Sequence, residues 1–536
     1  MRRYFPILII FLLFWSYGMA QVKHSVPLTL SEEPKNLSTL YLHPPSELLR
    51  IDESSKSALP QIIGKVYDTT FDVMKLARYD EVEEGRIYNL RIQINEAEGL
   101  ILYFSAFFLP QDGFLSITGK EIDNSYTFSY FNNPQGGSYS IPMTHGEYVT
   151  LRVFIPYAYS AEPHIILSGI GIIPKAEKGY GGSGSCEVNV NCNEGLQWTN
   201  QKDAIVRILV RNVNSIYWCT GTLINNARKD KTPYILTANH CGRGATKENL
   251  NQWQFFFNYE ANDCSQPAAE PELKLSVGGT KKAASDLSTT NLGSDFYLLT
   301  LNEGIPENVN AFFSGWSRLD QPSASGVCIH HPQGDIKKIS TFTTPTISSS
   351  WENMSNSHWK VSWSATENGH GVTEGGSSGC PLFNSNGLLM GTLTGGQSSC
   401  DSSNLNQPDY FGKFSAHWDL NGQADTLKLQ PFLDPDQIGM TTLEGMTLGI
   451  EQTIDILNLS VFPNPASQNI SLQLPINFSK SKIKVEIFHA SGQKVLETAL
   501  NGTSAVSIQI SHLRSGVYFI RISSEEKNTI SKFIKY

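Results

Sequence analysis

The chain has 536 residues, of which 40% are hydrophobic and 17% charged, fractions ordinary for a soluble globular protein. It is too long for one hydrophobic core, so we expect three or four domains. The net charge of −9 comes without a basic stripe, which excludes nucleic acid as a partner. The eight cysteines lie between Cys186 and Cys400 and form no CxxC pair, which predicts disulfides rather than a zinc site. The sequence gives no sign of an organic cofactor, and we expect neither a metal nor a cofactor.

The first twenty residues have the pattern of a secretory signal peptide. Arg2 and Arg3 are followed by an apolar run over 7–15 and by small residues that end at Ala20. We expect cleavage after Ala20. A membrane anchor is the alternative, but the run is shorter than the ~20 residues that a span needs.

Residues 21–178 are expected to form a pro-region. Residues 21–60 are polar and poorly periodic, which is typical of a flexible lead-in. From 62 to 173, runs that alternate polar and apolar residues are separated by turn formers, which predicts an antiparallel β-sandwich. A glycine-rich stretch with Lys178 follows, where a protease could cut to make Gly179 the first mature residue. A plain linker is the alternative interpretation.

The rest of the chain is expected to be mainly β as well. Residues 186–435 carry short apolar runs between Gly, Asn and Ser loops, which predicts a barrel-type domain that we bound at 179–445. Residues 458–536 carry further strand patterns and Asn-Gly and Ser-Gly turn signals, which predict a separate small β unit.

The stretch from Thr373 to Phe383 has the composition of a nucleophile loop. Its serines lie between glycines, which permit tight turns and a close approach of a substrate carbonyl. We assign Ser378 rather than Ser377 as the nucleophile. The amides of Gly376 and Ser378 would then stabilise an oxyanion. A serine is inert without a base, so a histidine and an acid must lie nearby.

His240 is the candidate base, because it follows an apolar strand and precedes Cys241. Asp295 is the candidate acid, because it enters a second apolar strand and would set the histidine tautomer. Asp286 is a rival acid without such a strand behind it. The order His, Asp, Ser within one cysteine-bearing β domain is a known arrangement of the catalytic triad.

These motifs resemble those of trypsin-like serine endopeptidases, and of bacterial lysyl endopeptidases in particular. The resemblance implies a double β-barrel over about 179–433, with His240, Asp295 and Ser378 as base, orienting acid and nucleophile. The stretches that carry it are 182–186 with Cys192, 220–224, 237–241, 330–340, 371–374 and 376–381.

The cysteine pattern of that family implies three disulfides. Two more cysteines remain, and we pair them by elimination. The resulting pairs are Cys186–Cys400, Cys192–Cys264, Cys219–Cys241 and Cys328–Cys380.

The resemblance also places the specificity pocket. The position six residues before the serine, where trypsins have an aspartate, is Val372. The lysyl endopeptidase pattern places this aspartate later, at Asp409, with Thr373 lining the pocket. Thr394, Gly395 and Gly396 would pair with the substrate backbone. The best-known members have a histidine where this chain has Thr394, so no role of that histidine carries over. For Asp409, a surface turn is the alternative interpretation.

Residues 458–536 resemble the sorting domain of the type IX secretion system. The resemblance implies an Ig-like β-sandwich that the secretion machinery recognises. It also implies export through the periplasm and outer membrane, to the medium or the cell surface. An accessory Ig-like binding module is the alternative interpretation. The matching stretches are 461–466, 487–495, 513–520 and 532–536.

The sequence therefore predicts a secreted, monomeric serine endopeptidase that cleaves after Lys, or after Arg, in protein or peptide substrates. One alternative is a serine protease with another preference at P1, the residue before the cleaved bond. A glutamyl preference, for example, would involve His330 or His331, but Asp409 argues against it. A catalytically silent surface adhesin on a protease scaffold is the other. The complete triad argues against the adhesin.

Overall fold

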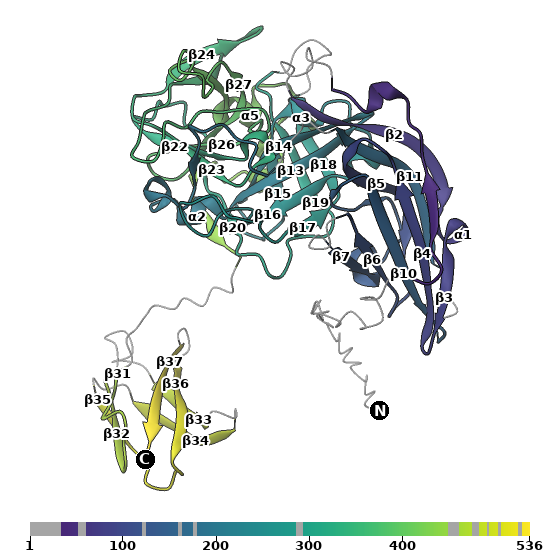
Figure 1. The fold of residues 1–536 in the computed structure, drawn as a ribbon. Coiled ribbons are helices and arrows are strands. Elements are labelled where there is room, and N and C mark those ends of the chain that lie inside the picture. The colour runs from purple at the N-terminus through teal and green to yellow at the C-terminus, as the bar shows by residue number, and fades with distance from the viewer. Residues whose placement is uncertain are drawn as a thin grey trace, which may run out of the picture. The chain divides into compact units, whose positions relative to one another are not determined.

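A computed structural model of the protein describes residues 34–51, 60–120, 125–158, 163–174, 180–285, 293–448, 460–473, 482–489, 493–501, 505–523 and 528–536. These residues fall into two compact units, divided after Leu448. Both are mainly β, as predicted (Figure 1). The expected signal peptide, Ala20, Lys178, Gly179 and Asp286 lie outside the described residues.

The N-terminal part of the first unit is a two-layer sandwich (Figure 1). Apolar side chains alternate along its strands and meet in one core, which includes Leu90, Phe104 and Leu151. One layer has the order β1-β4-β10-β6-β7 with β3 on β4, and the other the order β2-β11-β5-β8 with β9 on β5. The bounds are β1 Ser38–Tyr41, β2 Ile62–Asp72, β3 Arg78–Val82, β4 Gly85–Gln93, β5 Ala97–Phe108, β6 Phe114–Thr118, β7 Ser125–Ser129, β8 Tyr139–Ser140, β9 Thr144–His145, β10 Tyr148–Pro156 and β11 His164–Pro174.

Two expectations for this region need correction. Strand β1 runs parallel to β4, so the sandwich is not wholly antiparallel. Part of the expected lead-in is also folded, because Leu40, Leu42 and Leu48 pack against the sandwich core. The apolar residues here are too few to give a sustained periodic signal, but their burial against the sandwich favours an ordered segment.

The first barrel of the protease region follows Cys192. Its strand order is β17-β16-β13-β14-β15-β19-β18, and it closes because only Gly278, with a positive φ of 84°, separates β17 from β18. The bounds are β13 Ile205–Asn212, β14 Ser215–Ile224, β15 Tyr234–Thr237, β16 Gln254–Phe257, β17 Lys274–Val277, β18 Gly279–Ala284 and β19 Tyr297–Leu301.

The sandwich and this barrel are joined by strand pairing. Strand β2 pairs antiparallel with β14, so one twelve-stranded sheet runs through both. Residues from both parts also share a core, which includes Val66 and Tyr103 on one side and Ile216 and Trp218 on the other.

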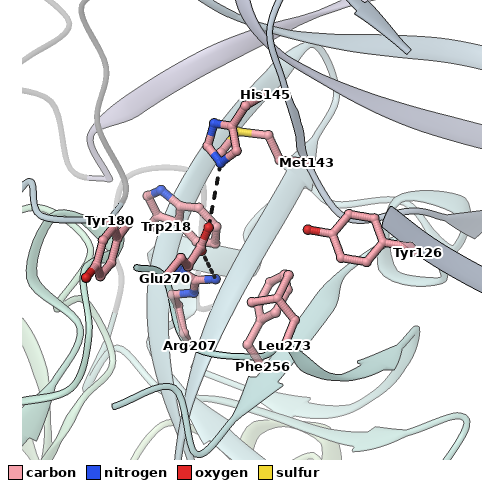
Figure 2. Close-up of a pocket in the computed structure, with 9 residues that line it drawn as sticks. All are labelled: Tyr126, Met143, His145, Tyr180, Arg207, Trp218, Phe256, Glu270 and Leu273. Atoms are coloured by element: carbon pink, nitrogen blue, oxygen red, sulfur yellow. Dashed lines mark ion pairs between the residues drawn. The ribbon is translucent and has the colours of Figure 1, made fainter. Parts of the chain in front are cut away.

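A small pocket lies where the sandwich and the first barrel meet. Figure 2 shows Glu270 between His145 of the sandwich and Arg207 of the barrel, with ion-pair distances of 3.6 and 3.9 Å. The Arg207 guanidinium lies over the rings of Trp218 and Phe256. This junction is therefore held by charge pairing as well as by apolar packing.

The second barrel is a ten-stranded sheet with the order β12-β23-β22-β26-β27-β28-β25-β24, to which β21 and β29 attach. A core that includes Leu236 and Leu298 of the first barrel and Ile329 and Leu389 of the second fixes the barrels against each other. The bounds are β12 Val188–Asn189, β21 Trp316–Ser317, β22 Gly326–His330, β23 Lys338–Phe342, β24 Ile347–Trp351, β25 Met354–Val361, β26 Pro381–Asn384, β27 Leu389–Gly396, β28 Asp409–Lys413 and β29 Thr442–Leu443; the pair β20 Phe312–Phe313 and β30 Met446–Thr447 is separate.

Helices in the described residues are short. The α-helices are α1 Val73–Leu76, α2 Thr199–Lys202, α3 Asn239–Gly242, α4 Lys247–Leu250, α5 Phe414–Asp419 and α6 Gln430–Leu433. The 3₁₀ turns are η2 Ser46–Leu48, η4 Tyr130–Asn132, η5 Asn193–Gly195, η6 Pro332–Gly334 and η7 Asp425–Leu427. Within the described residues, none of the helices has the length and apolar character needed to cross a membrane.

The second unit has two sheets around one apolar core, which includes Ile470, Ile487 and Ile520. The sheet orders are β31-β32-β35 and β34-β33-β36-β37. An Ig-like topology for this unit stays a prediction. The bounds are β31 Ser460–Phe462, β32 Asn469–Gln473, β33 Lys482–His489, β34 Lys494–Asn501, β35 Ala505–Gln509, β36 Gly516–Ser523 and β37 Asn528–Lys535.

A buried ion pair in the protease region gives a stability prediction. The Lys337 side chain is fully buried and its Nζ lies 2.7 Å from Glu260 Oε2, while Lys202 Nζ lies 2.8 Å from Oε1. Burial alone would raise the pKa of Glu260, but the two lysines outweigh it and hold the pKa at about 2. The pair should therefore stabilise the fold above pH ~4.5, with the stabilisation lost as the pH falls towards 2.

Glu260→Gln is expected to destabilise the protein by about 3–5 kcal/mol at pH 7, because Lys337 keeps a buried charge without its partner. Urea denaturation at pH 7 and pH 3 would measure the loss, which should shrink at the lower pH. Asp436→Asn is the matched control, since Asp436 pairs with Arg228 at the surface, where water screens the pair and its loss should have little effect on stability. Equal effects of the two substitutions would contradict the prediction.

Candidate active site

The predicted base, His240, lies in the first turn of helix α3, directly after strand β15. The disulfide Cys219–Cys241 ties this turn to strand β14. The His240 side chain is 7% exposed, so it is shielded from bulk water.

The predicted acid, Asp295, is fully buried and holds His240 through both carboxylate oxygens. Oδ2 lies 2.7 Å from His240 Nδ1, and Oδ1 accepts the backbone N–H of His240 at 2.9 Å. Nδ1 therefore carries the hydrogen, and Nε2 of the neutral ring is left as the acceptor. Nε2 has no hydrogen-bond partner among the described residues, so the ring is oriented but its reactive nitrogen is free.

The predicted nucleophile, Ser378, is fixed between the two barrels by its backbone. Its carbonyl accepts the N–H of Thr220 on β14 at 2.9 Å, and the N–H of Gly379 donates to Leu393 on β27 at 2.9 Å. Cys241 Sγ lies 3.8 Å from the same Ser378 carbonyl, so the residue after the base abuts the backbone of the nucleophile. The structure thus brings the base, the acid and the serine loop to one place.

The loop geometry also suits an oxyanion site. Gly376 has a φ of 91°, a conformation that other residues rarely adopt, and its carbonyl is turned away to accept the Thr220 hydroxyl at 2.9 Å. In the part of the chain that the structure describes, the amides of Gly376 and Ser378 donate no hydrogen bond. Two unpaired amides beside the serine are what a developing oxyanion needs.

Asp409 lies at the start of β28, fully buried and surrounded by donors. Its Oδ2 accepts from Trp363 Nε1 at 2.6 Å, Thr373 Oγ1 at 2.8 Å and Ser398 Oγ at 2.5 Å, and its Oδ1 accepts from the Ser398 amide at 3.2 Å. Burial is the largest influence and raises the pKa of Asp409, although these hydrogen bonds oppose it. The structure therefore places Asp409 and Thr373 together and rules out the surface-turn interpretation.

Strand β27 offers the expected edge for a substrate backbone. Its pairing with β26 ends at Thr392, whereas its pairing with β28 continues to Gly396. The outer edge of residues 394–396 therefore has no strand partner among the described residues. A Cβ on Gly396 would lie 1.9 Å from Asp409 Oδ1, so a glycine is required where the edge meets the carboxylate.

Sequence reasoning missed several partners of these residues. Trp363 and Ser398 were not predicted as donors to Asp409, and His358 was not predicted to reach Thr394, whose Oγ1 lies 3.0 Å from His358 Nε2. A histidine therefore contacts this position from strand β25 rather than from β27. Nothing in the local pattern of these residues signals a contact that depends on strand pairing across the sheet.

Three of the four predicted disulfides are present in the structure, namely Cys186–Cys400, Cys192–Cys264 and Cys219–Cys241. The fourth needs correction for this structure. Cys328 and Cys380 are buried thiols with their Sγ atoms 3.0 Å apart, adjacent but not bonded. Pairing by elimination therefore identified two neighbouring cysteines, but Cys328 and Cys380 are not bonded in this structure.

The two barrels, with the histidine, aspartate and serine loop at their junction, have the arrangement that the sequence predicts for a trypsin-like protease. Comparison with known proteins narrows this class. Residues 180–412 match the family model described as "Lysyl endopeptidase, C-terminal domain", and residues 460–536 match the one described as "Secretion system C-terminal sorting domain". Both resemblances drawn from the sequence are thereby confirmed, and the second indicates export to the cell surface or the medium.

A curated relative, the lysyl endopeptidase of Pseudomonas aeruginosa, is 31% identical over 249 residues, which are 44% of this chain and 51% of that protein. The chain thus spans about half the length of the curated relative that it matches. Two solved structures are also similar. The protease Anisep from Arthrobacter nicotinovorans is 18% identical, over 40% of this chain and 91% of that one, with a TM-score of 0.29. The HtrA-type protease AlgW is 14% identical, over 40% and 57%, with a TM-score of 0.27. Scores this low carry no further argument.

Proposed function

We propose that this chain is an exported serine endopeptidase that cleaves peptide bonds after lysine. The observation that supports it best is the His240–Asp295 pair, whose Nε2 has no partner among the described residues and whose neighbour Cys241 abuts the backbone of a serine loop with two unpaired amides. The family match over residues 180–412 points to the same activity.

The proposed reaction uses Ser378 as nucleophile. Its Oγ attacks the substrate carbonyl and its proton passes to His240 Nε2, while the amides of Gly376 and Ser378 receive the oxyanion. The C–N bond then breaks and the leaving amine takes the proton from His240. Water, activated by the same base, hydrolyses the acyl-enzyme and restores the serine.

The buried carboxylate of Asp409 supports a cationic P1 side chain. Three of its four hydrogen bonds fall on Oδ2, so Oδ1 keeps a free lone pair, next to the Gly396 edge. An ammonium group is a compact charge that can reach a single oxygen, whereas a guanidinium prefers two. This geometry favours lysine over arginine.

Two further parts of the proposal concern maturation and export. Cleavage after Lys178 would separate residues 21–178 from the protease region, and sequencing the N-terminus of secreted protein would test it. The type IX machinery would recognise residues 460–536 as the export signal. The secreted enzyme is expected to be a monomer, which size-exclusion chromatography would test.

A fluorophosphonate probe and a peptide library together test the function. Labelling of Ser378, located by mass spectrometry, would establish a working nucleophile, and the library would give the P1 residue directly. Cleavage after residues other than lysine or arginine would leave a protease of another specificity. Failure of the wild-type chain to react with the probe would favour the silent adhesin.

The raised pKa of Asp409 predicts a pH-dependent preference for lysine. As the pH falls through this pKa, which lies above the ~3.9 of an ordinary aspartate, the carboxylate is neutralised and no longer attracts the ammonium. The ratio of kcat/KM for a lysyl substrate to that for a norleucyl substrate should therefore fall with pH. Taking the ratio cancels any pH effect on steps that the two substrates share. A ratio that is constant from pH 4 to pH 8 would contradict the prediction.

A further inference from the structure

Ser377, the residue before the proposed nucleophile, has a fully buried side chain with two hydrogen bonds. Its Oγ lies 2.7 Å from His330 Nδ1 and accepts the N–H of Glu374 at 3.2 Å. The amides that flank it along the chain, at Gly376 and Ser378, are the two unpaired ones. The position of the Ser377 side chain therefore controls where both amides point.

The direction of these hydrogen bonds follows from Ser340. Its hydroxyl donates to the carbonyl of Val372 at 2.7 Å, so its one hydrogen is used. His330 Nε2, 3.1 Å from Ser340 Oγ, must then be the donor between them. A neutral His330 with its hydrogen on Nε2 accepts at Nδ1, and Ser377 donates to it. This series of hydrogen bonds runs from Ser377 through His330 and Ser340 to Val372. It therefore links the two ends of segment 372–377.

The two middle members of this series of hydrogen bonds are anchored in regular structure. His330 ends strand β22 and Ser340 lies on β23, and the two strands pair with Cys328 opposite Ser340. The histidine therefore has little freedom to move, and a rigid support of this kind suits a loop that must hold two amides in place.

The charge state of the surroundings supports a neutral histidine. Burial, together with the charge of Lys338, lowers the pKa of His330 to about 3. The carboxyl group of Glu187 lies 3.6 Å from Nε2, and its side chain is fully buried. Burial, with the nearby Glu374, raises the pKa of Glu187 well above its usual range. A protonated His330 would carry a hydrogen on Nδ1 and could not accept from Ser377.

We propose that His330 is a positioning residue for the oxyanion site, acting through Ser377 to hold the amides of Gly376 and Ser378 aimed at one point. The proposal rests on the proposed protease function. It assigns part of the catalytic geometry to a histidine that does not touch the substrate. The role of His330 in the reaction is thus distinct from that of the base, His240.

Ser377→Ala in the full chain tests the link. We expect kcat on a lysyl peptide to fall about 10²-fold with KM unchanged within about twofold, because a displaced oxyanion site weakens the transition state alone. A peptide with a C-terminal lysine aldehyde, which forms a hemiacetal with Ser378, should lose affinity in parallel. Lysinamide, which makes no oxyanion, should bind as before. Ser314→Ala is the matched control, a fully buried serine elsewhere in the protease region, and should leave kcat unchanged.

Two substitutions of His330 separate positioning from simple packing. Asn can present an acceptor where Nδ1 lies, whereas Leu cannot. His330→Asn should therefore keep kcat within about tenfold of wild type, while His330→Leu should match Ser377→Ala. Equal losses in the two histidine variants, or a loss in Ser377→Ala that appears in KM rather than kcat, would overturn the proposal.

Glu187→Gln tests the neutral state. The amide carries no charge, so kcat should stay within about twofold of wild type if His330 is neutral. A fall in kcat as large as that of Ser377→Ala would mean that an ionised Glu187 stabilises a charged His330. His330 would then donate to Ser377 rather than accept from it, and the proposal would be overturned.

The rate of fluorophosphonate labelling distinguishes failure of the positioning role from failure of the proposed protease function. Labelling of Ser377→Ala about 10²-fold slower than wild type supports the positioning role. Equal labelling of wild type and Ser377→Ala rejects that role but leaves the protease function in place. Failure of wild type to label rejects both.

Discussion

Ser378→Ala is expected to lower kcat on a lysyl peptide by about 10⁴- to 10⁶-fold, the loss typical of removing the nucleophile of a serine protease. The fold should be retained, because the Ser378 side chain makes no hydrogen bond within the described residues and its fixing contacts are those of the backbone. We expect the free energy of unfolding to change by no more than about 0.5 kcal/mol. Stopped assays with a fluorogenic lysyl peptide and thermal melts would measure both quantities.

The same substitution at Ser314 controls for the loss of a buried hydroxyl. Ser314→Ala should retain full activity, since among the described residues this side chain bonds only to the neighbouring Gly315 carbonyl. If Ser378→Ala retained more than about one hundredth of the wild-type kcat, the residue would not be the nucleophile. A large loss of stability without a loss of labelling would also argue against the assignment.

The sequence was most informative where function depends on short motifs. His240 before Cys241, Asp295 before a strand and the glycine-flanked Ser378 were each recognisable from local residues, and the structure brings them together. These positions are readable because a tight turn or a strand end restricts which residues fit there.

The sequence was least informative where a contact depends on strand pairing. The donors to Asp409 come from Trp363 and Ser398, which lie 46 and 11 residues away from it along the chain. The link between Ser377 and His330 spans 47 residues. Such contacts are set by the register of neighbouring strands, which periodicity alone does not specify.

The pairing of β2 with β14 is the largest feature that sequence reasoning could not reach. The pattern of residues 62–72 predicts a strand but not its neighbour, and the glycine-rich stretch before Cys186 suggested separate folding units. The structure instead gives the sandwich and the first barrel one sheet and one shared core. The residue pattern of a strand shows which side chains are apolar, but it does not specify which other strand will pair with it.

Asp409→Asn is expected to lower kcat/KM for a lysyl peptide by about 10²- to 10⁴-fold, because a desolvated ammonium would lose the carboxylate that we propose as its counter-charge. Most of the loss should appear in KM if the ammonium is bound equally in the ground state and the transition state. Activity on a norleucyl peptide should change by less than about threefold, since that side chain carries no charge.

Stability should change far less than activity in this variant. The carboxylate is fully buried and its pKa is raised by burial, so its charge opposes folding, and an asparagine oxygen can still accept from Trp363 and Ser398. Asp401→Asn, the same change at an exposed position eight residues earlier, is the matched control and should leave both quantities unaltered. An unchanged ratio of lysyl to norleucyl activity in Asp409→Asn would remove Asp409 from the pocket. A ratio that falls and loses its dependence on pH would instead identify this carboxylate as the source of the specificity.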